Sequence, residues 1–409
     1  MSSPPLEPAT ALPADTALPG LSSLFDADWV WHQFCTRFGT PDAMPKRVRI
    51  QQLSYQPGRR ALVSYVVEQS DTQWLVDDQF AIELRPGKPE LLFRYPDDPF
   101  LPGLAVAASP IEAHKLLAKH LPISPHRVLV EPVRYRPGTR AVLRHVVDWG
   151  PSRKTRTTLF ARVMPPARLP RLLAAAALAD SSGFSLPPIV GSWPEGGVVW
   201  LSEVPGETLR ERIREGTPPE PMRLLDALAP LWETPLKPDE GQPLDVLGGY
   251  RSTERLLGQV LEGREAALQP FSEVTDVLGP FAEAWHPSTL AHNDFHDDQV
   301  LITPAGHLAL VDFEEVGPGD AQLDVANLLA HLHWMARFGR SPKACETYRA
   351  RMRSSALERF GWDARDLDVR EAYAIFRLTS NPVRQMRGDW ASRVESGLSL
   401  AAEVLGRAT

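Results

Sequence analysis

Cysteine is scarce in this 409-residue sequence, which contains only Cys35 and Cys345. Two cysteines cannot build a disulfide framework that replaces a hydrophobic core, and they cannot form a cluster of cysteine metal ligands. Long apolar runs are missing as well, and none approaches the ~20 residues of a membrane-spanning helix. The net charge is −7 and no basic block accompanies it. This charge argues against general binding of nucleic acid.

The N-terminus has neither the basic region nor the apolar region of a secretory signal. Residues 1–20 are rich in proline and predict a disordered tail. We therefore expect a cytoplasmic protein with no membrane or nucleic-acid partner, whose oligomeric state the sequence leaves open. The length indicates two or three domains, and the hydrophobic content of 43% is typical of a globular protein.

Residues 290–332, LAHNDFHDDQVLITPAGHLALVDFEEVGPGDAQLDVANLLAHL, carry the chemistry. Two short aliphatic runs, at residues 300–303 and 307–311, flank the turn Pro-Ala-Gly and predict a β-hairpin. Asp294 and Gln299 precede the hairpin, and Asp312 follows it directly. A hairpin that brings its ends together would set the three side chains around one point. Their hard oxygen donors suit Mg²⁺ and a phosphate-bearing substrate.

Any one of these residues alone has an ordinary structural explanation. An Asp after a strand is usually a turn residue or a helix cap, and a lone His such as His292 is usually a surface or core residue. The combination of His292, Asp294, Gln299 and Asp312, bridged by a hairpin of suitable length, favours a kinase-like site instead.

The same stretch resembles the catalytic core of the aminoglycoside phosphotransferase and choline kinase-like family, relatives of the protein kinases. In that family a His-x-Asp-x-x-x-x-Asn loop supplies the catalytic Asp and one metal ligand, and a later Asp supplies the main metal ligand. The resemblance implies that Asp294 is catalytic and that Gln299, in place of Asn, and Asp312 bind the metal. HxDxHxxQ and Asp-Phe-Glu also resemble maltokinases. The resemblance further implies structural support of this loop by three residues: His292, Asp320 and Asp324.

A second pattern indicates an internal duplication. Residues 55–67, YQPGRRALVSYVV, and residues 135–147, YRPGTRAVLRHVV, are identical at seven of thirteen positions at an offset of 80. Phe80-Ala81 matches Phe160-Ala161 at the same offset, so that Ile82 would correspond to Arg162. We therefore predict two copies of a helix followed by a strand set. Two unrelated hairpins are the alternative.

The second copy is placed to be the nucleotide-binding lobe. The family resemblance implies that Arg162 stands where the phosphate-binding Lys is found, and that Glu203 and Val204 belong to the adenine-binding hinge. Gly138, in the Pro-Gly-Thr turn, takes the place of the Gly-rich phosphate loop, although a plain β-turn also explains it. Ile82, in the first copy, could not bind phosphate.

We accordingly predict an α+β, protein kinase-like bilobal fold, with a small β-rich lobe, a large helical lobe and an N-terminal α+β cap that resembles the small lobe. The predicted parts are a tail at 1–20, the cap at 21–105, the small lobe at 106–204 and the helical lobe with the catalytic loop at 205–409.

The predicted function is ATP-dependent and Mg²⁺-dependent phosphoryl transfer to a hydroxyl of a small molecule. A pseudokinase that binds nucleotide or serves as a scaffold is the main alternative, and a nucleotidyl transferase is another. The resemblance permits a sugar, an aminoglycoside or an amino alcohol as the acceptor; Gln299 and the cap favour a sugar-like polyol. His296, Asp297 and Asp298 face either the acceptor or the solvent. The same choice between an acceptor wall and a solvated face applies to three late residues: Arg377, Asn381 and Arg384.

Overall fold

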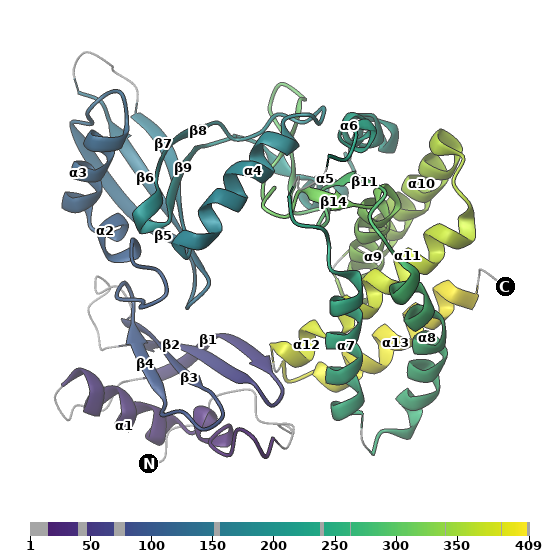
Figure 1. Ribbon diagram of the computed structural model, residues 1–409, viewed down its shortest axis with the longest axis horizontal. Helices are drawn as coiled ribbons and strands as arrows, with labels where there is room; N and C mark the ends of the chain where they lie inside the picture. Colours follow the sequence, from purple (N-terminus) through teal and green to yellow (C-terminus); the bar gives the residue numbers. More distant parts are fainter. Residues whose placement is uncertain are drawn as a thin grey trace. The chain divides into compact units, whose positions relative to one another are not determined.

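The computed structural model describes residues 15–39, 47–68, 78–150, 156–237, 241–261, 263–339, 341–385 and 387–406. These residues form two compact units (Figure 1). The first unit comprises Met1–Leu169, Ile189–Ser202 and Asn381–Ala391, and the second comprises Pro170–Pro188, Glu203–Ser380 and Ser392–Thr409. Positions 1–14 of the predicted tail lie outside the described residues. The division into cap, small lobe and large lobe stays a proposal.

The first unit contains a four-stranded antiparallel sheet in the order β1-β2-β3-β4. Its strands are β1 (Arg47–Gln56), β2 (Arg60–Glu68), β3 (Asp78–Leu84) and β4 (Leu91–Arg94). A short 3₁₀ helix, η1 (Ser22–Phe25), and α1 (Ala27–Phe38) pack on one face of this sheet. Asp26 caps α1 by accepting hydrogen bonds from the backbone N–H groups of Asp28 and Trp29, both at 3.0 Å.

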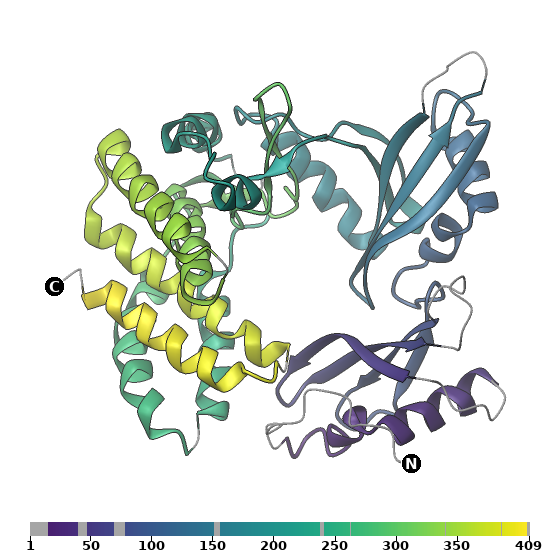
Figure 2. The same cartoon turned by 180° about the vertical axis from the view of Figure 1, so that it is seen from behind.

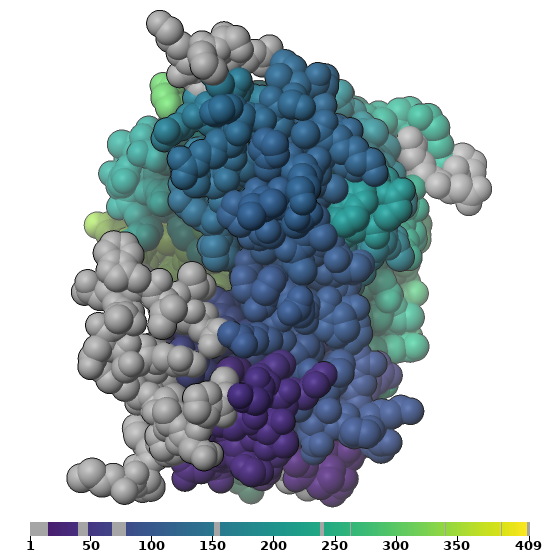
Figure 3. Space-filling model, turned by 90° about the vertical axis from the view of Figure 1, so that its left-hand side faces the viewer, coloured from purple at the N-terminus to yellow at the C-terminus, as the bar shows by residue number. Residues whose placement is uncertain are grey.

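A second antiparallel sheet in the same unit has five strands in the order β5-β6-β7-β9-β8. They are β5 (Arg127–Arg136), β6 (Arg140–Asp148), β7 (Arg156–Val163), β8 (Ile189–Trp193) and β9 (Val198–Ser202). Helices α2 (Leu104–Ala108) and α3 (Pro110–His120) contribute to the hydrophobic core on one face of this sheet. Figure 3 views the unit from this side, with the second copy in blue.

The two copies share a tertiary anchor that supports the predicted duplication. Asp15 Oδ2 accepts hydrogen bonds from the Tyr55 hydroxyl at 2.9 Å and the Gly58 N–H at 2.8 Å. Asp98 Oδ2 likewise accepts from the Tyr135 hydroxyl at 3.0 Å and the Gly138 N–H at 2.7 Å. Each aspartate begins the sequence pattern Asp-x-x-Leu-Pro-Gly-Leu. The two copies of this pattern are 98 − 15 = 83 residues apart, compared with 80 for the strands.

The strand register corrects the predicted match between Ile82 and Arg162. Leu62 pairs with Glu83, and Val142, which is equivalent to Leu62, pairs with Arg162. The two paired residues are 83 − 62 = 21 positions apart in the sequence of the first copy, but 162 − 142 = 20 positions apart in the second. Because neighbouring side chains on a strand point to opposite faces, a shift of one residue changes the face. Glu83, rather than Ile82, is the counterpart of Arg162.

Glu83 has the opposite charge to its counterpart. Its side chain is only 2% exposed and forms ion pairs with Arg60 and Arg85. An acidic side chain would repel a phosphate group. The conclusion drawn from Ile82, that the first copy is poorly suited to bind a nucleotide, therefore also holds for Glu83. The interpretation of the second copy as the nucleotide-binding lobe is unchanged.

The second unit is largely helical. Its helices are α4 (Leu169–Ala179, shared with the first unit at Leu169), α5 (Leu209–Arg214), α6 (Pro221–Glu233), α7 (Val246–Val260), α8 (Glu265–Ala284), α9 (Ala321–Phe338), α10 (Pro342–Phe360), α11 (Ala364–Thr379) and α13 (Trp390–Gly406, whose first two residues lie in the first unit). The short helices η2 (Pro166–Arg168), η3 (Pro194–Gly196) and α12 (Asn381–Arg384) belong to the first unit.

Helix α9 occupies the centre of the second unit, where it packs against α10 and α11 (Figure 2). Its buried residues include Val325, Leu329 and Leu332, which join the main hydrophobic core of the unit. This mixed architecture, with β-sheets in one unit and a helical bundle in the other, is the predicted α+β fold class. Among the described residues, no helix is both long enough and apolar enough to span a membrane.

Some predicted helix boundaries are wrong. Apolar periodicity in the sequence predicts helices at residues 251–267 and 271–285, but α7 ends at Val260 and α8 runs without interruption from Glu265 to Ala284. The same periodicity predicts a late helix at residues 366–386, but α11 ends at Thr379 and Asn381 begins the separate short helix α12. Local apolar periodicity indicates the existence of a helix better than its ends.

His145 provides a pH-dependent test of the second core. Its side chain is fully buried and its Nε2 atom lies 2.9 Å from the carbonyl oxygen of Ala107. Burial lowers the pKa of His145 to about 4, and the bond to Ala107 opposes this only in part. The unfolded chain therefore binds more protons than the folded chain between about pH 6.5 and pH 4. As the pH falls through this window, the free energy of unfolding should fall by up to about 3 kcal/mol.

We expect His145→Tyr to remove this contribution and flatten the pH profile of urea unfolding. Tyrosine suits the position because its counterpart, Tyr65, donates a hydrogen bond to the Leu24 carbonyl at 2.7 Å in the first copy. The same substitution at exposed His32 controls for the exchange of imidazole for phenol. Identical slopes for His145→Tyr and the wild type would contradict the assignment.

Candidate active site

The predicted hairpin is confirmed. β12 (Val300–Ile302) pairs antiparallel with β13 (Leu308–Leu310), and the Gly306 N–H closes the turn on the Thr303 carbonyl at 2.8 Å. Gly306 has φ = 80°, a conformation that favours glycine. Before and after the hairpin, β11 (Thr289–Ala291) pairs with β14 (Gly317–Gly319). The catalytic loop thus lies between two short ladders that fix both of its ends.

The structure brings Asp294, Gln299 and Asp312 together. Gln299 donates a hydrogen bond from Nε2 to Asp294 Oδ2 at 3.1 Å. The Gln299 carbonyl accepts a hydrogen bond from the N–H of Val311 at 2.9 Å. Asp312 is the next residue after Val311, so this bond holds its backbone close to that of Gln299. Burial is the main cause of the raised pKa of Asp294, and the negative charge of Asp312 raises this pKa further. The geometry expected from the hairpin is therefore present.

Two loop residues have left-handed backbone conformations. Asn293 has φ = 67° and Asp312 has φ = 65°, and they are the only non-glycine residues with positive φ among the described parts of the chain. Asn and Asp tolerate this region better than most residues. The Asn293 side chain stabilises its turn by donating from Nδ2 to the carbonyl of Glu315 at 2.9 Å. Such backbone strain clusters at functional sites because it directs side chains to fixed positions.

Asp324 holds the start of the catalytic loop. Its carboxylate accepts hydrogen bonds from the backbone N–H groups of His292 and Asn293, both at 2.7 Å, and from the indole N–H of Trp232 at 2.9 Å. Asp324 is 1% exposed. Burial raises its pKa to about 7, while the three donors oppose this by favouring the carboxylate.

Asp320 supports the same region from the start of α9. Its Oδ1 atom caps the helix by accepting from the Gln322 N–H at 2.8 Å. Its Oδ2 atom accepts from Arg370 Nε at 2.7 Å and from the indole N–H of Trp285 at 3.3 Å. Asp320 thereby ties α9 to α11 and to the end of α8.

The family resemblance implies that His292 supports the loop, but its ring nitrogens do not provide this support. Within the described part of the chain neither ring nitrogen has a hydrogen-bond partner, and the ring packs edge-on against Phe295 with centroids 5.8 Å apart. Complete burial lowers the pKa of His292 to about 3, so the imidazole is neutral at physiological pH. His292 contributes its backbone N–H to Asp324 and its ring to the core.

Burial is the main influence on the pKa of Asp294 and raises it. Positive charge on His296 and Arg377 acts in the opposite direction, as does the hydrogen bond from Gln299. A carboxyl whose pKa is raised toward neutrality is a better proton acceptor at physiological pH than an ordinary aspartate. The environment of Asp294 is therefore compatible with a catalytic base.

The loop acids Asp297 and Asp298 both form ion pairs with Arg210. The predicted choice between the acceptor and the solvent therefore left out their actual partner. Arg210 Nε contacts Asp297 Oδ2, and Arg210 Nη1 lies 2.6 Å from Asp298 Oδ2. Asp297 is fully buried, whereas Asp298 is half-exposed. No motif in the sequence singled out Arg210, which lies 87 residues before Asp297.

His296, Asp297 and His331 offer ligand atoms within 4.8 Å of one another. The two imidazole rings are stacked, with centroids 4.4 Å apart and planes at 4°. Parallel stacked rings cannot both direct an in-plane nitrogen lone pair at one ion, and Asp297 already binds Arg210. The cluster is therefore a packing arrangement rather than a metal centre.

Gln299 and Asp312 fit a hard cation better. With its amide nitrogen directed at Asp294, Gln299 leaves Oε1 buried and without a hydrogen-bond partner among the described residues. A buried amide oxygen beside a carboxylate is a suitable donor pair for Mg²⁺. Gln299 and Asp312 therefore stay the predicted metal ligands.

The predicted nucleotide-contacting residues are divided between the units. Gly138 and Arg162 lie in the first, whereas Glu203 and Val204 begin a segment of the second, directly after β9. Arg162 is 8% exposed and lies on the face of β7 opposite the core residues Ala161 and Val163. These placements leave the roles of Arg162, Glu203 and Val204 as proposals.

Gly138 is better explained by the plain β-turn. Its N–H, which a phosphate would need, donates to the Asp98 carboxylate at 2.7 Å. A Cβ built on Gly138 would lie 3.2 Å from Arg60 Nη2 and from the Phe100 ring, so the turn is packed against other residues of the first unit. The repeated Asp-x-x-Leu-Pro-Gly-Leu pattern was the signal that could have revealed this anchor.

Residues 139–367, more than half of the chain, match the model of the phosphotransferase enzyme family, APH. The chain belongs to this family. The resemblance inferred from residues 290–332 is thereby confirmed, whereas the maltokinase-like features remain a prediction.

Among solved structures, a choline kinase from Cryptosporidium parvum Iowa II is similar, with 12% identity over 72% of this chain and 95% of that chain and a TM-score of 0.51. A thermostable mutant of aminoglycoside phosphotransferase APH(4)-Ia, in complex with AMP-PNP and hygromycin B, has 15% identity over 71% and 98% of the two chains and the same TM-score. These likenesses show the kinase-like fold. No curated protein sequence gives a significant match.

Gly319 tests how tightly the catalytic loop is packed. A Cβ at this position would lie 2.0 Å from Asn293 Oδ1 and 2.8 Å from Ala291 Cβ. We expect Gly319→Ala to lower the free energy of unfolding by about 1–3 kcal/mol, because the loop must move to admit the methyl group. Urea unfolding measures this change.

Gly258→Ala is the matched control. Gly258 lies within α7, and nothing lies within 4 Å of the position that its added methyl group would occupy. Alanine there should stabilise the helix by about 0.5–1 kcal/mol. Equal effects of the two substitutions would show that the packing around Asn293 does not constrain the loop.

Proposed function

We propose that this protein is an ATP-dependent phosphotransferase that acts on a hydroxyl group of a small molecule. The observation that carries the proposal is the hydrogen bond between Gln299 and Asp294, together with the backbone bond from Val311 to Gln299 that sets Asp312 at the end of the same hairpin. One carboxylate is thus free to act as a base while an amide oxygen and a second carboxylate can hold a cation. Family membership supports the same reaction class.

Asp294 accepts a hydrogen bond from the acceptor hydroxyl and takes its proton as the oxygen attacks the γ-phosphorus. Gln299 orients Asp294 by donating to Oδ2, which leaves Oδ1 for the acceptor. The left-handed turn at Asn293 and the anchor on Asp324 fix the direction of the Asp294 side chain. Positioning of this kind accounts for much of the catalysis in phosphoryl transfer.

Asp312 and Gln299 Oε1 would hold Mg²⁺, which when bound neutralises charge on the transferred phosphates. Arg162 is the candidate for contacts to the α- and β-phosphates, because a guanidinium can hold phosphate oxygens bidentately. Glu203 and Val204 are the candidates for backbone contacts to adenine. Gly138 can join them only if its N–H leaves Asp98.

A pseudokinase remains the second candidate. Arg162 in place of Lys and the engagement of the Gly138 amide by Asp98 favour it. The arrangement of Asp294, Gln299 and Asp312 opposes it, because a protein without transfer activity has no need to keep a base beside two oxygen ligands.

The test combines nucleotide binding with turnover. We expect ATP and ADP to raise the melting temperature of the protein only with Mg²⁺ present, and Asp312→Asn to abolish this shift. Asp294→Asn should keep the shift but lower acceptor-dependent ADP release by about 10²–10⁴-fold, since it removes the base.

Asp226→Asn is the control, because Asp226 lies on α6 in an exposed ion pair with Arg359 and should change neither readout. A magnesium-dependent shift together with ADP release that is insensitive to Asp294→Asn would point to the pseudokinase and a contaminating activity. The absence of any nucleotide shift at millimolar concentration would count against both.

A further inference from the structure

A tight turn lies between the proposed base, Asp294, and strand β12. The Gln299 N–H donates to the His296 carbonyl at 3.1 Å and closes residues 296–299 into a turn whose two central residues are both aspartates. The side chain of Gln299 donates to Asp294. The conformation of this turn therefore determines where the Gln299 amide lies relative to the base.

Arg210, on α5, holds both central residues of the turn. Its Nε atom contacts Asp297 Oδ2, its Nη1 atom lies 2.6 Å from Asp298 Oδ2, and its backbone N–H donates to the Asp297 carbonyl at 3.2 Å. Asp297 is fully buried, and its Oδ1 atom has no hydrogen-bond partner among the described residues. His331 Nδ1, at 3.8 Å from Oδ1, is too distant for a hydrogen bond. Arg210 is thus the group that compensates the buried charge of Asp297.

Without a cation, the two carboxylates would tend to open the turn. Neighbouring like charges repel each other, and burial strengthens the repulsion because water no longer screens it. A guanidinium suits this position, since its planar fork of donors can contact both carboxylates at once. Arg210 therefore favours the closed turn, in which the Gln299 side chain reaches Asp294.

Helix α5 gives the Arg210 side chain a fixed origin. Thr208 caps the helix, because its Oγ1 atom accepts from the Glu211 N–H at 3.1 Å and its own N–H donates to Glu211 Oε2 at 2.8 Å. Ile213, near the end of the helix, is buried in the main core of the second unit. Just before the helix, β10 (Glu207–Thr208) pairs antiparallel with β12. The backbone that carries Arg210 is therefore bonded directly to the hairpin that follows the turn.

We propose that Arg210 is a positioning residue for the phosphotransferase reaction. It holds the acidic turn closed and thereby keeps the Gln299 amide directed at Asp294, with the amide oxygen available to magnesium. The inference rests on the proposed function and deepens it, because it makes the metal site depend on a residue of α5. Arg210 acts only through the turn and takes no part in proton transfer.

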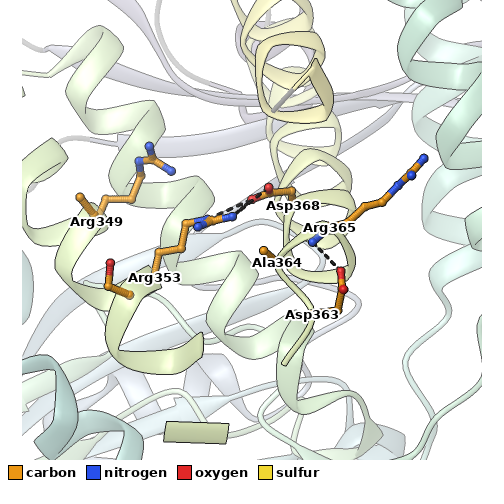
Figure 4. A pocket seen from close by; sticks show the side chains of 8 residues that line it. Arg349, Arg353, Asp363, Ala364, Arg365 and Asp368 are labelled. Carbon is orange, nitrogen blue, oxygen red and sulfur yellow. Dashed lines mark hydrogen bonds and ion pairs between the residues drawn. The ribbon is translucent and has the colours of Figure 1, made fainter. Parts of the chain in front are cut away.

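Arg353 forms a comparable ion pair elsewhere in the second unit. It contacts both carboxylate oxygens of Asp368 beside a pocket of about 620 Å³ between α10 and α11, where Figure 4 shows its guanidinium directed at that carboxylate. The arginine side chains are 34% exposed at Arg210 and 25% exposed at Arg353, and the partners Asp297 and Asp368 are 0% and 3% exposed. Arg353 bonds α10 to α11 rather than to the catalytic loop, so its substitution is a matched control.

Magnesium binding tests the proposal without turnover. A fluorescent ADP analogue reports the magnesium concentration at which nucleotide is half-bound, at a temperature where each variant is folded by circular dichroism. Arg210→Gln should raise this concentration about 10- to 100-fold, because Gln299 is no longer held in place as a metal ligand. Coulomb attraction alone would change it in the opposite direction, since removing a cation near the site favours binding of a divalent cation.

Hydrogen exchange of the ligand-free protein is the second readout. The Gln299 N–H closes the turn, so its exchange should be about 10- to 100-fold faster in Arg210→Gln than in the wild type. Asp297→Asn should remove most of both effects of Arg210→Gln, because the guanidinium acts through this carboxylate. Arg353→Gln should lower the free energy of unfolding to a similar extent as Arg210→Gln and leave both readouts unchanged.

Arg210→Lys covers the case in which Arg210→Gln does not fold, because an ammonium still compensates the buried charge of Asp297. It cannot contact both aspartates with the geometry of a fork. Magnesium binding and Gln299 exchange should therefore change in the same directions by a smaller factor.

Three results would overturn the inference: magnesium binding that is unchanged or tighter in Arg210→Gln, Gln299 exchange that is unchanged in the Arg210 variants, or equal effects of Arg353→Gln. The phosphotransferase function stands in each of these cases. A wild-type protein without any magnesium-dependent nucleotide binding would instead contradict the proposed function, and Gln299 exchange alone would then decide whether Arg210 holds the turn.

Discussion

The catalytic loop depends on one buried carboxylate. The Asp324 carboxylate accepts hydrogen bonds from the backbone N–H groups of the consecutive residues His292 and Asn293. The chain must therefore turn at Asn293, just before Asp294. The left-handed conformation of Asn293 and the absence of space for a methyl group at Gly319 are consequences of this turn. Because Asp324 lies on α9, the position of Asp294 is fixed relative to a helix that lies in the main core of the second unit.

Much of the site could be predicted because its residues are close together in the sequence. The hairpin from Val300 to Leu310 is encoded locally, by short aliphatic runs and a Pro-Ala-Gly turn, and it brings the chain at Asp312 back toward Asp294. The family pattern spans the same residues. The helical lobe also follows from apolar periodicity, although the break after Val260 does not, because helix ends depend on tertiary contacts.

The predictions that failed depended on contacts between distant residues. The match of Ile82 to Arg162 assumed a constant offset, and one additional residue between paired strands moved Glu83 into that position. Arg210 forms ion pairs with both Asp297 and Asp298 from a helix far away in the chain, so the sequence of the loop alone does not show that these acids are paired. Burial of His292 likewise could not be inferred from its place in a motif.

The anchoring aspartates have a consequence for dividing this protein into modules. Asp15 and Asp98 each hold the hairpin turn of their own copy, yet both precede the first helix of that copy. A module cut just before α1, or one cut at the start of α3, would lose the carboxylate that fixes its sheet. Recombination or domain exchange between relatives should therefore succeed only at junctions upstream of these aspartates, where the Asp-x-x-Leu-Pro-Gly-Leu segment travels with the sheet that it fastens.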